Sequence, residues 1–413
     1  MRSSLPWFIT GHFGHHLLGA LPQPLLPTIR DTFGLSIFQT TLVSTVFSFA
    51  SGLGNIPAGR LADKLGPTWL MTIATLGVAI GGFLVGLSGS FVWFMIFLTL
   101  MALMTAGYHP ASTPMILSAV EPEKRGRALG LHLFGGNFSF FISPILAGFI
   151  VKYWSSMGAR GPFLVMSIPA MIIGVLFFIY LTRHGGVTQV KIAKQRAAQE
   201  NPPQAGYKRR LWAYLIQMIV GGGAAVSINA LLGLYMVDRF GVDKASVPWI
   251  LSVNFLPAVF GGTIVGGWIS DRIGSVKIII SSGILGGLLY FGIATSTALN
   301  FGFFLLLFVM GVVQAIRMPV TEVFIMGQTP AKNRATIYGI YYFTMSYTGA
   351  IFAPIYGALV DSNPVPAAGH FSYETIFMFS AITVTAISII TSFFFWDAKD
   401  PYEMERAAKK KSG

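Results

Sequence analysis

The sequence predicts an all-α membrane protein in which twelve transmembrane helices form two related halves of six. Of the 413 residues, 54% are hydrophobic and only 10% are charged, whereas a soluble domain carries about 25% charged residues. The mean hydropathy is +0.67. Apolar segments of roughly 20 residues, each long enough to cross a bilayer, recur along almost the whole chain. We expect these segments to be helices because a helix satisfies its own backbone hydrogen bonds in lipid.

Twelve apolar segments account for most of the chain. The first one contains three histidines and no small-residue cleavage site, so we expect a retained span and not a removed signal peptide. Cysteine is absent, which excludes disulfides and thiolate metal sites. The predicted spans cover approximately residues 6–28, 37–59, 68–88, 91–118, 127–151, 162–182, 211–237, 246–269, 277–297, 301–328, 335–360 and 373–396.

The basic residues are distributed unequally between the predicted loops. With a cytoplasmic N-terminus, 22 of the 28 Lys and Arg residues lie on the inner side, five lie outside and Arg317 lies within a span. This asymmetry predicts that both termini are cytoplasmic. The expected location is the plasma membrane, as a bacterial inner-membrane protein. The asymmetry also explains the net charge of +13 without nucleic acid as a partner. The five outer residues are Arg30, Lys152, Arg160, Arg239 and Lys244.

The chain is expected to divide into two homologous halves. A polar stretch with seven basic residues, 183–210, predicts a cytoplasmic linker between halves 1–182 and 211–396, with a cytoplasmic tail at 397–413. A constant shift of 208 residues relates positions in the two halves, which indicates an internal repeat. The related pairs are Gly54 and Gly262, Gly59 and Gly267, Asp63 and Asp271, Gly66 and Gly274, Pro122 and Pro330, and Lys124 and Lys332.

The repeated loop motif resembles a family signature. Two copies of G-x-x-x-D-[KR]-x-G follow the second and eighth spans, at 59–66 and 267–274, and they resemble the signature of the major facilitator superfamily. The resemblance implies two six-helix bundles with a substrate site between them at the midplane. The first copy departs from the pattern because Pro67 and Thr68 stand where a basic pair is common.

Three short motifs point to one branch of that superfamily. The fourth span carries Gly107-Tyr108-His109-Pro110 in place of the usual arginine motif, and the others are 135–137 (GGN) and 15–18 (HHLL). Together they resemble the fosmidomycin-resistance-type branch, which implies export. Pro110 and Pro114 each remove a backbone donor and are expected to bend this span.

The signature loops are expected to act as cytoplasmic gates. Asp63 can cap a helix N-terminus or pair with Arg60 or Lys64, and Asp271 can pair with Arg272. Either pairing would close one half against the other. The alternative is that the loops only anchor the topology.

Charged residues inside the spans are candidates for transport because a charge in the membrane core is costly. Arg317 offers a planar fork of donors that suits an anion, and the 208-residue shift relates it to His109, which can titrate near neutrality. Glu322 follows five residues after Arg317 and is the leading candidate for proton coupling. The alternative is that Glu322 neutralises Arg317 and organises packing. Further residues predicted to bind substrate are Tyr108, Asn137, Asn229 and Gln314, although Asn and Gln also join helices.

Three histidines lie near one face of the first span. His12, His15 and His16 are spaced i, i+3 and i+4. No carboxylate or cysteine accompanies them there, so no metal site is predicted. His15 and His16 are predicted to relay protons or line the cavity, and interhelical hydrogen bonding is the alternative.

These features predict a secondary active transporter that works by alternating access. The expected function is proton-coupled export of a small organic anion or amphipathic drug by a monomer without a cofactor. No nucleotide-binding loop is present, nor is a G-x-S-x-G or HExxH motif, so neither ATP drive nor an enzyme is predicted. A carboxylate importer, working as a symporter or a uniporter, and a lipid flippase are the alternatives.

Overall fold

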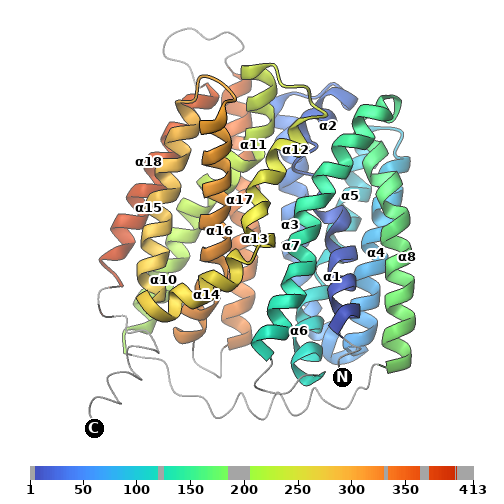
Figure 1. Ribbon diagram of the computed structural model, residues 1–413, viewed down its shortest axis with the longest axis horizontal. Helices are drawn as coiled ribbons and strands as arrows, with labels where there is room; N and C mark the ends of the chain where they lie inside the picture. The colour runs from blue at the N-terminus through green and yellow to red at the C-terminus, as the bar shows by residue number, and fades with distance from the viewer. Residues whose placement is uncertain are drawn as a thin grey trace.

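The computed structural model describes residues 5–119, 125–184, 205–329, 334–362, 372–395 and 397 (Figure 1). These residues form helices and short connections, and no strand occurs among them. Nine helices in this part of the chain are long and apolar enough to cross a membrane, and apolar segments Phe91–Thr105 and Val247–Val259 are shorter. Together with the first helix, they correspond one to one with the twelve predicted spans, so the predicted fold class is confirmed.

The first bundle is formed by the helices before residue 185. It has two buried apolar clusters, one around Leu18 and Phe94 and one around Met71 and Phe177. Its helices are α1 (Leu5–Gly19), α2 (Leu26–Phe33), α3 (Ile37–Leu65), α4 (Pro67–Leu87), α5 (Phe91–Thr105), α6 (Tyr108–Ala119), α7 (Arg125–Tyr153) and α8 (Arg160–His184).

The second bundle repeats this arrangement around clusters that include Tyr235 and Ile279. A π-helical turn at Met218–Gly222 connects its first two helices, and a short 3-10 turn at Val253–Phe255 follows the third. Its helices are α10 (Tyr207–Gln217), α11 (Gly223–Phe240), α12 (Val247–Ser252), α13 (Leu256–Val259), α14 (Gly262–Ile273), α15 (Ser275–Ala294), α16 (Phe301–Gly327), α17 (Arg334–Asp361) and α18 (Tyr373–Ser392).

Helix ends recur at the predicted spacing of 208 residues. Helices α3 and α14 end at residues 65 and 273, and α4 and α15 begin at 67 and 275. The connecting residues Gly66 and Gly274 both have positive φ, 81° and 94°, a conformation that glycine adopts without steric cost. The internal repeat is therefore visible in the backbone.

Three predicted spans are broken where a single helix was expected. The first ends at Gly19, before the prolines at 22 and 24, and α2 then forms separately. The fourth breaks at 106–107, between α5 and α6, close to the prolines that the sequence places at 110 and 114. The eighth breaks at Gly261, where φ is 93°. In contrast, α16 continues through Pro319.

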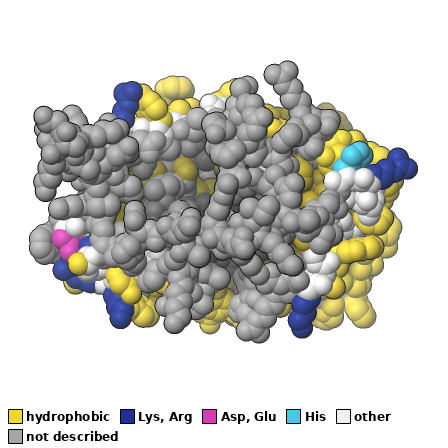
Figure 2. All heavy atoms as spheres, turned by 90° about the horizontal axis from the view of Figure 1, so that it is seen from below, with side chains coloured by type: hydrophobic (Ala, Val, Ile, Leu, Met, Phe, Trp, Pro, Cys, Tyr) yellow, Lys and Arg dark blue, Asp and Glu magenta, His cyan; other side chains and the backbone are white. Residues whose placement is uncertain are grey.

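Exposed apolar side chains cover the outside of both bundles. Trp93, Ile168, Leu288 and Ile382 are each more than half exposed, and Figure 2 shows hydrophobic side chains around the flanks. Only a lipid environment removes this much apolar surface from water while helices satisfy the backbone. The protein is therefore an integral membrane protein.

The two bundles meet at the end of the molecule that carries α2, at the top in Figure 1, which we name the α2 end. There α3 packs along α17, and Asp361 accepts hydrogen bonds from the backbone N–H of Ile37 (3.0 Å) and Phe38 (2.7 Å). Thr45 donates to the carbonyl of Ala350 at 2.9 Å. We name the opposite end, where α1 begins, the Leu5 end.

Candidate transport site

Five histidines from three helices of the first bundle gather into one cluster. They are His12, His15 and His16 of α1, His109 at the start of α6, and His132 of α7. The break before α6 turns its first residues toward α1. We name this set the histidine cluster.

The rings of the cluster stack closely. The rings of His12 and His132 are parallel with centroids 4.1 Å apart, and that of His109 lies 5.2 Å from His12 and 5.3 Å from His16. The ring of Tyr108 stacks on His15 at 4.6 Å. The sequence relates His109 to Arg317 by position and does not predict its neighbours on α1.

Hydrogen bonds to carbonyls determine which ring nitrogens carry protons. His12 Nδ1 lies 2.8 Å from the carbonyl oxygen of His132, and His132 Nδ1 lies 3.2 Å from that of Phe8. A carbonyl oxygen only accepts, so each Nδ1 donates and each neutral ring keeps its lone pair at Nε2. The Tyr108 hydroxyl also donates to Phe8, at 3.2 Å.

Two glycines bring α7 against α1. A Cβ at Gly135 would lie within van der Waals overlap of the carbonyl of Ile9, and one at Gly136 would lie 2.6 Å from Cε1 of His12. The GGN motif therefore has a packing function, because only glycine leaves room for the His12 ring. Sequence reasoning missed His132, although its position three residues before Gly135 on the same helix was an available signal.

Exposure differs sharply within the cluster. His12, His15 and Tyr108 are buried, His16 is half-buried and His109 is exposed. Since His109 contacts α1 on one side, its exposed side opens away from α1. Tyr108 lies behind the histidines, fully buried, so its placement favours support of the rings over direct contact with a substrate.

Arg317 lies in the second bundle, on α16. It is half-buried, and its Nη1 lies 3.5 Å from the hydroxyl of Ser282 on α15. Among the described residues, no hydrogen bond or ring contact joins Arg317 to His109. The side chain of Glu322 lies outside the described part of the chain.

The amide residues take different positions. Asn137 donates from Nδ2 to the carbonyl of Ala258, at 3.4 Å, and so connects α7 to α13 of the other bundle. Asn229 is half-buried on α11, and Gln314 is exposed on α16. The position of Asn137 favours the alternative that this amide joins helices.

The signature loops are only partly described. Lys64 is exposed at the end of α3, and the guanidinium of Arg272 lies 3.7 Å from the ring centroid of Trp268. The side chains of Asp63, Arg60 and Asp271 lie outside the described part, so the predicted pairings stay predictions.

Ion pairs join the bundles at the α2 end. Arg30 donates through Nη1 and Nη2 to both carboxylate oxygens of Asp238, each at 2.7 Å. Lys244 bonds to Asp31 at 2.7 Å. Two of the five predicted outer cations therefore connect the bundles, and we name these two pairs with Asp361 the α2-end latch.

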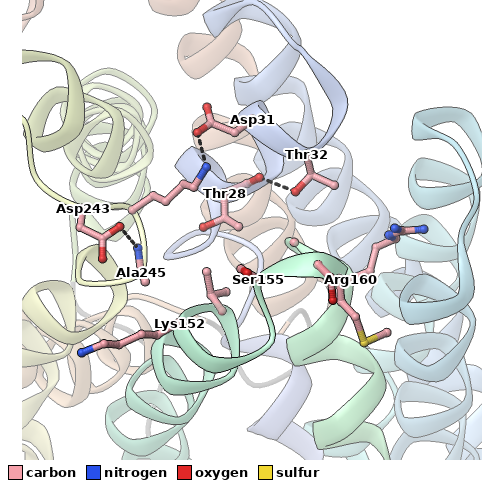
Figure 3. A pocket seen from close by; sticks show the side chains of 13 residues that line it. Thr28, Asp31, Thr32, Lys152, Ser155, Arg160, Asp243 and Ala245 are labelled. Carbon is pink, nitrogen blue, oxygen red and sulfur yellow. Dashed lines mark hydrogen bonds and ion pairs between the residues drawn. The ribbon is translucent and has the colours of Figure 1, made fainter.

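A pocket of about 440 Å³ opens beside this latch (Figure 3). Asp31 and Asp243 line it together with Lys152, Arg160 and Lys244. Two carboxylates and three basic groups thus line the pocket, and it shares no residue with the histidine cluster.

At the Leu5 end, basic side chains lie around the rim (Figure 2). Arg210 of α10 is fully buried; it donates from Nε to Gln328 at 2.7 Å and pairs with Asp397 at 3.0 Å. Desolvation alone would raise the pKa of Asp397, but hydrogen bonds and Coulombic attraction from Arg210 and Arg209 lower this pKa below its usual value.

Two repeated six-helix bundles, joined at one end and carrying polar groups between apolar helices, define a membrane transporter and not an enzyme. The profile of the Major Facilitator Superfamily matches residues 8–243 and again 213–412. The chain belongs to this superfamily, as the signature loops predict.

Several relatives are named for drug resistance. The chain is 26% identical over 276 residues to the fosmidomycin resistance protein of Escherichia coli K12, covering 66% of each. It is 25% identical to the multidrug resistance protein MdtG of Klebsiella pneumoniae 342, covering 89% of this chain and 88% of that one. It is also 25% identical to the multi-drug resistance efflux pump PmrA of Streptococcus pneumoniae TIGR4, covering 90% and 92%.

Solved structures share the fold. A POT family transporter in complex with a thioalcohol-conjugated peptide has a TM-score of 0.75 at 15% identity, covering 95% of this chain and 96% of that one. A bacterial homologue of the human lysosomal transporter Spinster, in an inward-facing and occupied conformation, has a TM-score of 0.67 at 16% identity, covering 96% of each chain.

Proposed function

We propose that this transporter exports a small organic anion or amphipathic drug in exchange for protons, by alternating access. The observation that carries the proposal is Arg317, a permanent charge that is half-buried within a membrane helix. Such a charge is costly in a membrane core, and its planar donor fork matches carboxylate or phosphate geometry. The described partner, a serine hydroxyl at 3.5 Å, leaves the charge without compensation from that side.

The direction and the orientation rest on two further arguments. Relatives are named for drug resistance and efflux, which favours export. The excess of Lys and Arg in the opposite loops supports a topology with the α2 end outside and both termini in the cytoplasm of a bacterium. The α2-end latch would then close the outer side, and the conformation would be inward-facing.

Proton coupling is assigned to Glu322, with His15 and His16 as further candidates. A substrate anion at Arg317 would compete with the Glu322 carboxylate for the same guanidinium, so substrate binding and protonation would be linked. Full pH-gradient-driven transport by Glu322→Gln in reconstituted vesicles would eliminate Glu322 from this function.

A ligand screen tests the anchor. The unfolding temperature of the purified protein is measured with each of a panel of organic anions. The measurement is repeated on Arg317→Ala and Arg239→Ala with every anion that stabilises the wild type. Arg239 is a surface arginine of the same bundle paired with Glu374, so it controls for loss of charge. Stabilisation that disappears only in Arg317→Ala supports the proposal; equal stabilisation of all three proteins contradicts it.

Import and lipid movement are the competing functions. Uptake measured in vesicles of known orientation distinguishes export from import of the same anion. A fluorescent lipid that changes leaflet at a rate unaffected by Arg317→Ala would favour a flippase.

A further inference from the structure

We propose that His12, His16 and His109 bind a divalent transition-metal ion of the Zn²⁺, Co²⁺, Ni²⁺ or Cu²⁺ class. This site lies within the first bundle, and it depends neither on the anion that is transported nor on its direction. The sequence predicts no metal here because no carboxylate or cysteine accompanies the three histidines of α1. The contribution of α6 changes that conclusion.

The three rings already approach the geometry of a metal site. One ring nitrogen from each histidine lies within 4.8 Å of the other two. Zinc–nitrogen bonds of about 2.0–2.1 Å place the ligand nitrogens of a tetrahedral site about 3.4 Å apart. The ring nitrogens must therefore come closer by up to about 1.4 Å. Torsional changes of the half-buried His16 and the exposed His109 can supply this movement.

His12 is held in the form that a metal requires. Its Nδ1–H donates to the carbonyl of His132 at 2.8 Å, so its lone pair is at Nε2. The side chain is 2% exposed, and Nε2 has no hydrogen-bond partner among the described residues. A carbonyl on the other ring nitrogen is the arrangement that orients metal-ligating histidines. A metal ion would satisfy the buried lone pair.

The donor set selects the class of ion. Within the described part of the chain, no carboxylate joins the group, and the chain has no cysteine. Imidazole ligands suit Zn, Cu and Ni, whereas Mg²⁺ and Ca²⁺ prefer oxygen. Three histidines leave a coordination position open, and the exposed side of His109 provides access from outside the cluster.

Ring packing without an ion is the competing explanation, and metal titration separates the two. The protein is purified with a tag that contains no histidine, made metal-free by chelation and dialysis, and titrated with Co²⁺ and Zn²⁺. Metal bound per chain is measured by elemental analysis after equilibrium dialysis, and Co²⁺ coordination by its visible absorption. About one ion per wild-type chain is expected, with absorption typical of nitrogen ligands.

Single substitutions locate the ion. His16→Ala and His109→Ala are expected to weaken binding at least 100-fold, because loss of an outer-shell partner alone typically costs about 10–100-fold. His184→Ala is the matched control, since this exposed histidine at the end of α8 stacks on Tyr180 outside the cluster, and it should bind as the wild type does. Thermal unfolding in metal-free buffer establishes that each variant is folded.

Three results would overturn the inference. The inference fails if the wild type binds no ion above background, if the two cluster variants keep full affinity, or if His184→Ala loses as much affinity as they do. The wild-type measurement decides the question even if a variant does not fold. Failure of the anion screen with Arg317→Ala would leave this result unaffected, because Arg317 belongs to the other bundle.

Discussion

Asp361 connects the two bundles through the N-terminus of α3, and its removal should open the α2 end. Its carboxylate accepts hydrogen bonds from the backbone N–H of Ile37 and Phe38, at 3.0 and 2.7 Å. Loss of a helix N-cap costs about 0.5–2 kcal/mol, and loss of the favourable charge at the positive helix end adds about 0.3–1 kcal/mol. Because the contact exists only while the bundles are together, Asp361→Ala penalises the closed state alone.

The expected shift is large enough to measure. A loss of about 1–2 kcal/mol changes the ratio of closed to open molecules by a factor of about 5–30. The chain has no cysteine, so Ser155→Cys and Ala298→Cys can carry a spin-label pair, one on each bundle, without removal of native thiols. Both positions are exposed at the α2 end, and pulsed electron-spin resonance reports the fraction of long distances.

Matched variants identify the cause. Asp243 lies at the same end, but its carboxylate accepts a hydrogen bond from the backbone N–H of Ala245 in its own loop. Asp243→Ala should therefore leave the spin-label distances unchanged. Asp361→Asn keeps an amide oxygen that can cap α3 and should restore part of the closed population. If Asp361→Ala and Asp243→Ala give the same distances as the parent, the cap does not hold the bundles together.

Two further predictions concern stability, both measured by thermal or denaturant unfolding in detergent. Gly136→Ala should destabilise the protein by about 1–3 kcal/mol, the usual cost of overpacking, because its Cβ would lie 2.6 Å from the ring of His12. Gly89 faces open space, so Gly89→Ala should be neutral and serves as the control. A neutral Gly136→Ala would contradict the close approach of α1 and α7. Asp397→Asn should destabilise at neutral pH because it removes the carboxylate that pairs with Arg209 and with the buried Arg210; since Asp397 itself is partly exposed, the expected loss is about 1 kcal/mol. The pKa of Asp397 is lowered in the folded protein. This stabilisation is therefore complete above the ordinary aspartate pKa of about 3.9 and disappears as pH falls through the pKa of the folded state. The stabilities of wild type and variant should converge in acid, and a constant difference at all pH values would contradict the pairing.

The fold could be predicted further than the site. The hydropathy identifies the twelve spans, and the 208-residue shift predicts that helix ends recur between the halves, as those at 65 and 273 do. The predicted spans themselves end earlier, at 59 and 269. The breaks in the helices depend on backbone details. Only in the fourth span did prolines lead us to expect a bend.

The histidine cluster could not be predicted because it joins residues that are far apart in the sequence. His12 and His132 are 120 residues apart, and nothing in a single sequence relates α1 to α7. The repeat relates His109 and Arg317 in sequence, but equivalence between halves is not contact. His109 lies against α1, and Arg317 lies beside Ser282.

The histidine cluster is built entirely within one bundle, and this limits what it can do in a transport cycle. If the bundles rock as bodies, the distances among its rings stay the same in both conformations. A ligand held only there binds both conformations equally and cannot shift the equilibrium between them, however tightly it binds. Only a ligand that contacts both bundles can favour one conformation over the other. A ligand bound in the histidine cluster therefore contributes to coupling only through a group that reaches toward Arg317.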